Sequence, residues 1–322
     1  MVDMKAVKSR VDMLNMFPKG SVGLEIGTYR GTYAKYIADI VEPKMLHLVD
    51  PWEHQDSDKW EDNKRNYDQN KFNGIFGDVQ KIFTDYDNVT IHRLYSDEAV
   101  YEFDDEHFDW IYIDGCHMYE CVKADMTAYF PKVKKGGLIA GHDLMVNNKF
   151  GTSVIRAFNE LVATGLVELS YITLDKSPSY ALTKTSTDKL VYPCEMKRFD
   201  RKRIPSLFRG GPHVLCVSLE RSQLNKIKKM CKPIAINDVE TAHGKFNIVY
   251  IGDVKDRVID QFDNLCECLA HGGRIIVNQY GVSKSLQANS IFLVTRLLQT
   301  GLFLPTFVTS DFGPAIILEK KT

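Results

Sequence analysis

The sequence predicts an α/β protein with an open, doubly wound and mostly parallel sheet, followed by a smaller domain of the same kind. In residues 1–185, short apolar runs alternate with amphipathic segments, which is typical of parallel strands joined by crossover helices. Carboxylate and imidazole residues follow several of these runs, at the strand ends where ligands bind in such sheets. After residue 211 a similar succession begins again without those residues.

The elements of the first part can be assigned in chain order. Apolar runs predict strands at residues 22–26, 45–49, 90–94, 110–113 and 138–140. Helical spacing of apolar residues predicts helices at residues 5–15, 32–41, 122–130 and 153–163. Residues 167–174 and 180–183 are expected to pair as antiparallel strands that close the sheet. Residues 52–76 are too long for a simple connection and are expected to form a functional loop or lid.

Changes in composition divide the chain into three parts. Residues 1–185 are expected to form the first domain, residues 186–211 a basic linker, and residues 212–322 a degenerate second domain. The end of the chain repeats the end of the first domain at a constant separation of 136 positions, so that Gly136 matches Gly272 and Lys184 matches Lys320. Because the separation is constant, we interpret the similarity as an internal duplication. A period of this length indicates two related domains, since stacked solenoids repeat over about 20–50 residues.

The composition excludes several classes of protein. Of the 322 residues, 44% are hydrophobic and 26% charged, and the formal net charge is −1, so nucleic acid is not an expected partner. No apolar run reaches the roughly 18 residues of a membrane span, and the first residues lack a signal-peptide pattern. The seven cysteines show no paired spacing. We therefore expect a cytoplasmic protein, and a homodimer is left open.

Residues 24–32 predict a strand that runs into a tight turn and then a helix. Gly27 and Gly31 would let the backbone approach a ligand, but the Gly-x-Gly-x-x-Gly pattern of dinucleotide-binding proteins is absent. Asp50 follows the next predicted strand, where a carboxylate can accept hydrogen bonds from both hydroxyls of a ribose. The combination predicts a pocket for an adenosine-containing ligand that has no pyrophosphate.

Two further strand ends carry groups suited to catalysis. Asp114 and His117 follow the strand at 110–113, and His142 and Asp143 follow the strand at 138–140. Asp114, His142 and Asp143 could converge on one cation, for which Mg²⁺ or Mn²⁺ are the candidates. His117 is the preferred general base, because an imidazole titrates near neutrality. A metal-free site with His117 or His142 as base stays open.

With these residues, positions 15–185 resemble the class I S-adenosylmethionine-dependent methyltransferases, and among them the macrocin-type group of sugar and natural-product O-methyltransferases. The resemblance rests on residues 25–31, Asp50, residues 113–120, Asp125 and residues 136–143. It implies a Rossmann-like sheet, S-adenosylmethionine as cofactor and transfer of a methyl group to a sugar or glycan hydroxyl. It also implies acidic metal ligands, although several relatives have two adjacent carboxylates where this chain has His142-Asp143.

The resemblance also assigns roles to individual residues. The cofactor-binding set is Glu25, Gly27, Thr28, Gly31, Asp50, Trp52, Ser96, Asp97 and Asp114. The catalytic set is His117, Asp114 and His142, and the metal ligands are Asp114, His142 and Asp143. In the second domain, Asn278-Gln279 stand where His142-Asp143 stand in the first, so that domain is expected to be non-catalytic. Methylation of another small molecule or of nucleic acid, and a non-catalytic scaffold that binds cofactor, are the alternatives.

Overall fold

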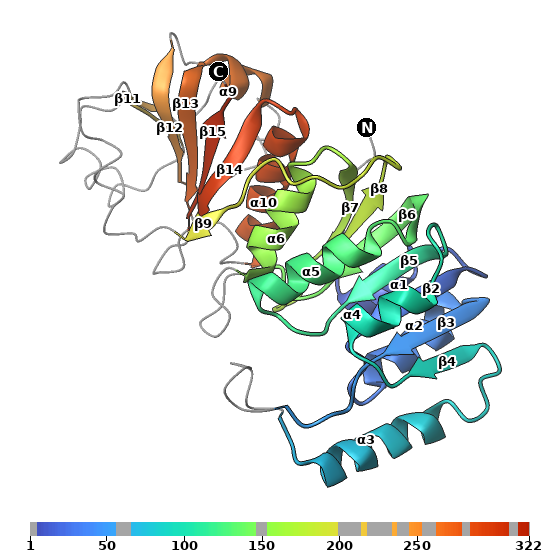
Figure 1. Ribbon diagram of the computed structural model, residues 1–322. Helices are drawn as coiled ribbons and strands as arrows, with labels where there is room; N and C mark the ends of the chain where they lie inside the picture. Colours follow the sequence, from blue (N-terminus) through green and yellow to red (C-terminus); the bar gives the residue numbers. More distant parts are fainter. Residues whose placement is uncertain are drawn as a thin grey trace. The chain divides into compact units, whose positions relative to one another are not determined.

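The computed structural model describes nine stretches of the chain, which are residues 5–55, 66–145, 153–198, 214–217, 234–236, 245–252, 262–278, 284–308 and 315–321. The chain divides into two compact units. The first unit comprises Met1–Asp143 and Leu166–Leu190, and the second comprises Leu144–Gly165 and Val191–Thr322. Figure 1 shows the strands of the first unit in blue to yellow-green and the later strands of the second in yellow to red.

The first unit contains an eight-stranded mixed sheet in the order β1-β7-β8-β6-β5-β2-β3-β4. Its strands are β1 (Lys5–Val7), β2 (Val22–Ile26), β3 (Met45–Val49), β4 (Val89–His92), β5 (Phe108–Ile113), β6 (Val133–Gly141), β7 (Val167–Thr173) and β8 (Tyr180–Lys184). Strand β8 is antiparallel to both of its neighbours, and the other pairs are parallel. The structure therefore has the predicted α/β, Rossmann-like architecture, with the antiparallel pair that the sequence placed at its end.

Helices connect the parallel strands of the first unit. They are α1 (Arg10–Leu14), α2 (Thr32–Val41), α3 (Gln69–Ile82), α4 (Ser96–Ala99), the 3-10 turn η2 (Val100–Glu102) and α5 (Tyr119–Tyr129). Two helices begin at side-chain caps, since Ser9 accepts a hydrogen bond from the Asp12 N–H and Asp68 accepts one from the Lys71 N–H. Helix α2 begins instead at Gly31, whose φ of +72° is a left-handed conformation that glycine adopts readily.

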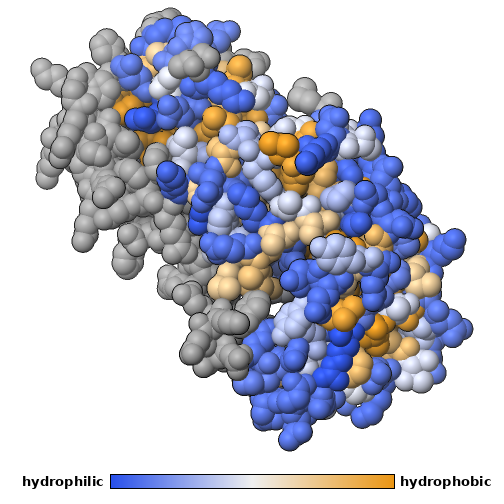
Figure 2. Space-filling model, in the orientation of Figure 1, coloured by the Kyte–Doolittle hydropathy of each residue, from blue (hydrophilic) through white to orange (hydrophobic). Residues whose placement is uncertain are grey.

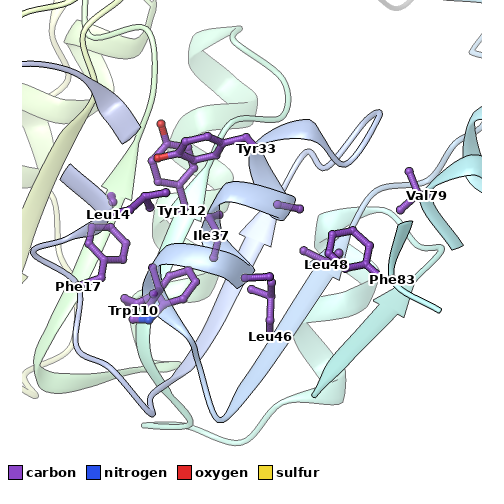
Figure 3. Packing of buried hydrophobic residues seen from close by; sticks show 14 of the residues in the cluster. Leu14, Phe17, Tyr33, Ile37, Leu46, Leu48, Val79, Phe83, Trp110 and Tyr112 are labelled. Atoms are coloured by element: carbon purple, nitrogen blue, oxygen red, sulfur yellow. The ribbon is translucent and has the colours of Figure 1, made fainter. Parts of the chain in front are cut away.

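The main core packs helices α1, α2 and α3 against one face of this sheet. Side chains that alternate along a strand point to opposite faces, so Trp110 and Tyr112 of β5 contribute to this core together. Figure 3 shows the rings of Tyr33 and Tyr112 against each other, with centroids 4.7 Å apart, and Phe17 beside Trp110. The core thus fixes α2, and with it the turn between β2 and α2, against the centre of the sheet.

Two predicted elements differ in the structure. Residues 5–15, predicted as one helix, form the edge strand β1 and then the short helix α1, because Lys5–Val7 pair with the parallel strand β7. The segment 52–76, predicted as a loop or lid, contains the start of α3, which buries Phe72 and Ile75 in the core. Part of the predicted lid lies outside the described residues.

The second unit contains a seven-stranded sheet in the order β11-β10-β12-β13-β15-β14-β9. Its strands are β9 (Lys197–Arg198), β10 (Val214–Val217), β11 (Ile234–Ile236), β12 (Phe246–Ile251), β13 (Leu269–Asn278), β14 (Phe303–Val308) and β15 (Ala315–Lys320), and its helices are α6 (Ser153–Val162), α9 (Phe262–Glu267) and α10 (Lys284–Gln299). Helix α6, expected in the first domain, groups with this unit, and β9 lies within the predicted linker.

The two sheets share one strand order. Reading from β11 to β9 in the second sheet gives the counterparts of β3, β2, β5, β6, β8, β7 and β1 in the first, and a counterpart of β4 is absent from the part of the chain that is described. Leu138 pairs with Thr183 in the first sheet, and Arg274 pairs with Glu319 in the second, 136 positions further along the chain in both strands. The separation found in the sequence therefore also relates the hydrogen-bonded registers.

Hydrophilic residues cover most of the described surface in the view of Figure 2, with smaller hydrophobic areas between them. Among the residues that the structure describes, no helix is both long and apolar enough to cross a membrane.

Candidate functional site

Four neighbouring strands of the first sheet end in one row of paired residues. The last residues of β2, β3, β5 and β6 are paired across the sheet, and they are Ile26, Val49, Ile113 and Gly141. The residue that follows each of them belongs to the predicted site, and these are Gly27, Asp50, Asp114 and His142. Because the carboxyl ends of parallel strands form one edge of a sheet, the structure brings these predicted residues together.

Gly27 lies where two of these strand ends meet. Its φ is +91°, and a Cβ atom there would lie 2.4 Å from the carbonyl oxygen of Asp114, so no other residue fits without displacing the β5 loop. The Gly27 N–H donates to Val49 O at 2.8 Å, and the Asp114 N–H donates to Ile26 O at 2.8 Å. These contacts hold the ends of β2, β3 and β5 in one rigid arrangement with backbone exposed at the turn.

Glu25 has an unusual environment below this turn. Its side chain is buried, and burial, with the charge of Asp114 as a second cause, raises its pKa to about 8. The nearby Thr28 hydroxyl acts in the opposite direction on this pKa, but neither Glu25 Oε2 nor Thr28 Oγ1, both buried, has a well-aligned hydrogen-bond partner among the described residues. Buried polar atoms are almost always paired, so these two atoms point to a ligand that is polar at this position.

Asp50 is oriented by the backbone around it. One carboxylate oxygen accepts the Tyr29 N–H and the other the Trp52 N–H, both at 2.9 Å. Burial raises the pKa of Asp50, and the two backbone hydrogen bonds act in the opposite direction. Each oxygen keeps a further lone pair, so the carboxylate can still accept hydrogen bonds from a ligand.

Trp52 belongs to the core. It is fully buried, its ring packs against Phe76 at 5.0 Å, and its Nε1 donates to Tyr29 O at 2.6 Å. The indole therefore supports the turn that holds Asp50.

Asp114, His117 and Asp143 form a compact group of ionisable side chains. His117 Nε2 lies 3.4 Å from Asp114 Oδ1 and 3.2 Å from Asp143 Oδ2, so the imidazole stands between two carboxylates. On the other side of Asp114, Arg10 Nη1 donates to Oδ2 at 3.1 Å. Asp143 has a φ of +55°, a strained conformation for a residue with a side chain, which suits a site rather than a simple connection.

His142 is held from the opposite side of its ring. Its Nδ1 lies 3.0 Å from Ser179 Oγ, which lies 2.8 Å from the hydroxyl of Tyr112. Burial lowers the pKa of His142, and the charges of Asp114 and Asp143 oppose that effect. A neutral imidazole that orients its neighbours fits this environment better than a charged one.

The residues expected to bind a metal do not fit that role here. Among the described residues, no group of three or more His, Cys, Asp and Glu side chains is arranged to hold a metal ion. The imidazole of His117 stands between the carboxylates of Asp114 and Asp143, where a bridging cation would have to lie. The expected Mg²⁺ or Mn²⁺ site therefore has no support in the geometry.

Ser96 and Asp97 lie at the start of α4, after β4. Ser96 Oγ donates to Asp125 Oδ1 at 2.6 Å, and the hydroxyl of Tyr129 donates to Ser96 O at 2.8 Å. Burial raises the pKa of Asp125 to about 6. Ser96 therefore joins α4 to α5, and Asp97, in the first turn of α4, lies beside this join.

Three residues that the sequence did not indicate also belong to this edge. Arg10 comes from α1, Tyr112 lies within β5, and Ser179 precedes β8. None of them lies in a recognisable motif. Ser179 follows a proline in a predicted turn, which was the one signal available for it.

Comparison with known proteins finds a family model that matches part of the first unit. Residues 24–144 match a family model described as a methyltransferase domain. No curated protein matches the chain significantly. Over that stretch the match agrees with the predicted enzyme class, a methyltransferase.

Many solved structures resemble parts of the chain. A Corynebacterium glutamicum protein matches at 12% identity and a TM-score of 0.42, covering 57% of this chain and 85% of its own. Aeropyrum pernix fibrillarin, solved with natively bound S-adenosyl-L-methionine, matches at 16% identity and 0.37, covering 52% and 67%. Phosphoethanolamine N-methyltransferase 1 from Haemonchus contortus, solved with phosphoethanolamine and S-adenosylhomocysteine, matches at 8% identity and 0.38, covering 97% and 91%.

Proposed function

Since residues 24–144 form a methyltransferase domain, we propose that the chain binds S-adenosylmethionine at the strand ends of the first sheet and methylates a hydroxyl group of a sugar or glycan. The main support for this binding site is Glu25 Oε2, a buried oxygen without a well-aligned partner that lies two residues before Gly27 at the end of β2. The hydroxyl acceptor rests on the resemblance of residues 113–120 and 136–143 to the macrocin-type group.

Each binding residue has a defined part in this proposal. Glu25 accepts a hydrogen bond from the α-ammonium group of the methionine part, which gives its orphaned oxygen a partner. Asp50 accepts hydrogen bonds from the ribose hydroxyls with its remaining lone pairs. Gly27 lets the backbone of Asp114 and Gly115 pack directly against the turn, which places Asp114 at the edge of the pocket.

The catalytic group supplies orientation and a base. Bound S-adenosylmethionine supplies a methyl group on a positively charged sulfur, and the acceptor hydroxyl must lose its proton as it attacks. His117 accepts that proton, and the carboxylates of Asp114 and Asp143 hold its ring and stabilise the charge that it gains. His142 is held by Ser179 and positions this group through Asp143, whose Oδ1 lies 3.6 Å from its Nε2; it is not itself the base, because burial disfavours its charged form.

For the second unit we propose an origin by duplication of the first and a non-catalytic role. The shared strand order and the shared register separation support the duplication. Its sequence has no Asp-Gly-x-His pattern after β12 and has Asn278-Gln279 where the first unit has His142-Asp143. A cytoplasmic location and a homodimer remain predictions from the sequence.

Calorimetry with S-adenosylhomocysteine tests the binding site. Glu25 is mostly protonated near pH 6 and ionises toward pH 8, and only the carboxylate form pairs fully with an ammonium group. The affinity of the wild-type protein should therefore rise from pH 6 to pH 8, with release of a proton. Glu25→Gln should bind more weakly by about tenfold and lose this dependence on pH. Absence of binding at every pH would contradict the site, and equal affinity of the two proteins would remove Glu25 from it.

Transfer of a labelled methyl group to a panel of glycans tests the reaction. We expect activity to persist in a chelator and to fall about 10²- to 10⁴-fold in His117→Gln, the range associated with a positioned base. Loss of activity in chelator, with recovery on adding Mg²⁺, would overturn the metal-free scheme. Cofactor binding without transfer to any acceptor would favour the scaffold alternative.

A further inference from the structure

A guanidinium group reaches the strand ends from the N-terminal segment. Arg10 begins α1, outside the stretch matched by the methyltransferase model. Its Nη1 donates to Asp114 Oδ2 at 3.1 Å, and its guanidinium carbon lies 4.4 Å from the centre of the Tyr33 ring. Its backbone N–H donates to Asp175 Oδ2 at 2.8 Å, and its side chain is 33% exposed. The group is thus fixed on two sides and still accessible to a ligand.

The edge of the sheet around Arg10 is rich in carboxylates. Glu25, Asp50, Asp114 and Asp143 all lie at or next to the paired strand ends. Among the described residues, Arg10 is a permanently charged side chain that forms an ion pair with one of these carboxylates, Asp114. A ligand with a carboxylate group would be repelled from this edge unless that group met Arg10.

The positions of Glu25 and Arg10 suit the two ends of an amino-acid group. Arg10 contacts Asp114 at the end of β5, and Glu25 lies on the neighbouring strand β2, where the charges of Asp114 and Arg10 both act on its pKa. The orphaned oxygen of Glu25 suits an ammonium group. A guanidinium carries five N–H donors in a planar fork, and Asp114 and the Tyr112 hydroxyl are its partners here, so donors remain for a second carboxylate.

We propose that Arg10 binds the α-carboxylate of the methionine part of S-adenosylmethionine while Glu25 binds the α-ammonium. The inference rests on the proposed cofactor site and adds to it a specificity-determining residue from the N-terminal segment. Tyr33 holds the plane of the guanidinium, and Asp114 sets its direction. The segment from β1 to α1, which precedes the matched residues 24–144, therefore completes the cofactor pocket.

Two nucleosides that differ by one group test this inference. S-adenosylhomocysteine has both the ammonium and the carboxylate, and S-adenosyl-3-thiopropylamine has the ammonium alone. We expect the wild-type protein to bind the first at least tenfold more tightly than the second. Arg10→Gln should bind S-adenosylhomocysteine at least tenfold more weakly than the wild type and bind the amine within twofold of it. Arg10→Lys should retain part of the discrimination, because a lysine keeps the charge and loses the planar fork.

Arg30→Gln is the matched control, because Arg30 lies in the same turn as Gly27 and is fully exposed; it should bind both nucleosides as the wild type does. If Arg10→Gln weakens both nucleosides equally, Arg10 only positions Asp114 and the inference is overturned while the cofactor site stands. If the wild-type protein does not distinguish the two nucleosides, the carboxylate has no partner and the inference is likewise overturned. A wild-type protein that binds neither nucleoside overturns the proposed function, and this inference with it.

Discussion

Strand β8 of the first unit and strand β15 of the second end in a buried or partly buried lysine with the same bonding pattern. Lys184 Nζ donates to two carbonyl oxygens at 3.0 and 2.7 Å, and Lys320 Nζ donates to two at 2.9 and 3.1 Å. The accepting residues are Phe130 and Val133 in the first unit and Cys266 and Leu269 in the second, again 136 positions apart. The two units thus share individual interactions as well as strand order.

The strand ends differ where the interiors agree. Cys216 occupies the place of Glu25, since it pairs with Tyr250 of β12 as Glu25 pairs with Tyr112 of β5. Gly252 follows β12 where Asp114 follows β5. By sequence, Asn278 stands where the first unit has His142.

This difference separates what the fold needs from what the site needs. The second sheet keeps its register and its lysine with Gly252 at the position that Asp114 occupies in the first, so the fold does not require a carboxylate directly after this strand. A buried carboxyl group such as Glu25 costs stability, and the second unit has a cysteine in its place. The comparison supports a chemical role for the strand-end residues of the first unit.

The largest expected effect comes from exchanging a strand-end residue between the units. Asp114→Gly gives the first unit the residue found after β12, and we expect methyl transfer to fall by about 10³-fold, because the base and Arg10 both lose their shared partner. Gly252→Asp is the reciprocal change and should leave activity within twofold. Activity assays and circular dichroism of both variants check this. If the Asp114→Gly protein stays active, the residue after β5 is no more important for methyl transfer than the residue after β12.

The elements of the first sheet could be predicted because each central strand is a short apolar run with polar residues on both sides. The N-terminal segment could not, since Lys5–Val7 form an edge strand of three residues that only the pairing with β7 defines. Helix α3 was missed for a related reason. Its polar face resembles a loop, and its three buried residues count only once the neighbouring sheet is present.

The candidate site was predictable where the residues follow strands and unpredictable where they reach it from elsewhere. Asp50 and Asp114 were found because parallel strands end at one edge. Arg10 meets Asp114 across 104 positions, and no local pattern encodes that contact. The arrangement of His117 between two carboxylates was also beyond the sequence, which suggested a cation there instead. The assignment of Trp52 to the core depended on the structure in the same way.

A smaller effect is expected when the shared lysines are removed. Lys184→Met and Lys320→Met each remove two hydrogen bonds to backbone carbonyl groups, which should destabilise the local structure by about 1–3 kcal/mol. Lys184 also lies 4.6 Å from the Phe130 ring, where the second unit has Cys266, so its loss should cost about 0.5–1 kcal/mol more. Hydrogen exchange of β6 and β13 amides measures each unit separately. An effect confined to one unit would contradict the equivalence of the two lysines.

The smallest expected effect tests the backbone that the units share. Gly136 in β6 and Gly272 in β13 have φ values of +84° and +67°, and they precede the residues at which each strand resumes regular pairing with its neighbour. A Cβ atom at Gly136 would meet nothing within 4 Å, so Gly136→Ala should cost about 1 kcal/mol through the backbone conformation alone. We expect Gly272→Ala to cost the same, measured by exchange of the amides that follow each glycine. A cost above about 3 kcal/mol at one glycine alone would show that Gly136 and Gly272 have different structural roles. The two sheets would then share the register of strand pairing but not the conformation of these glycine turns.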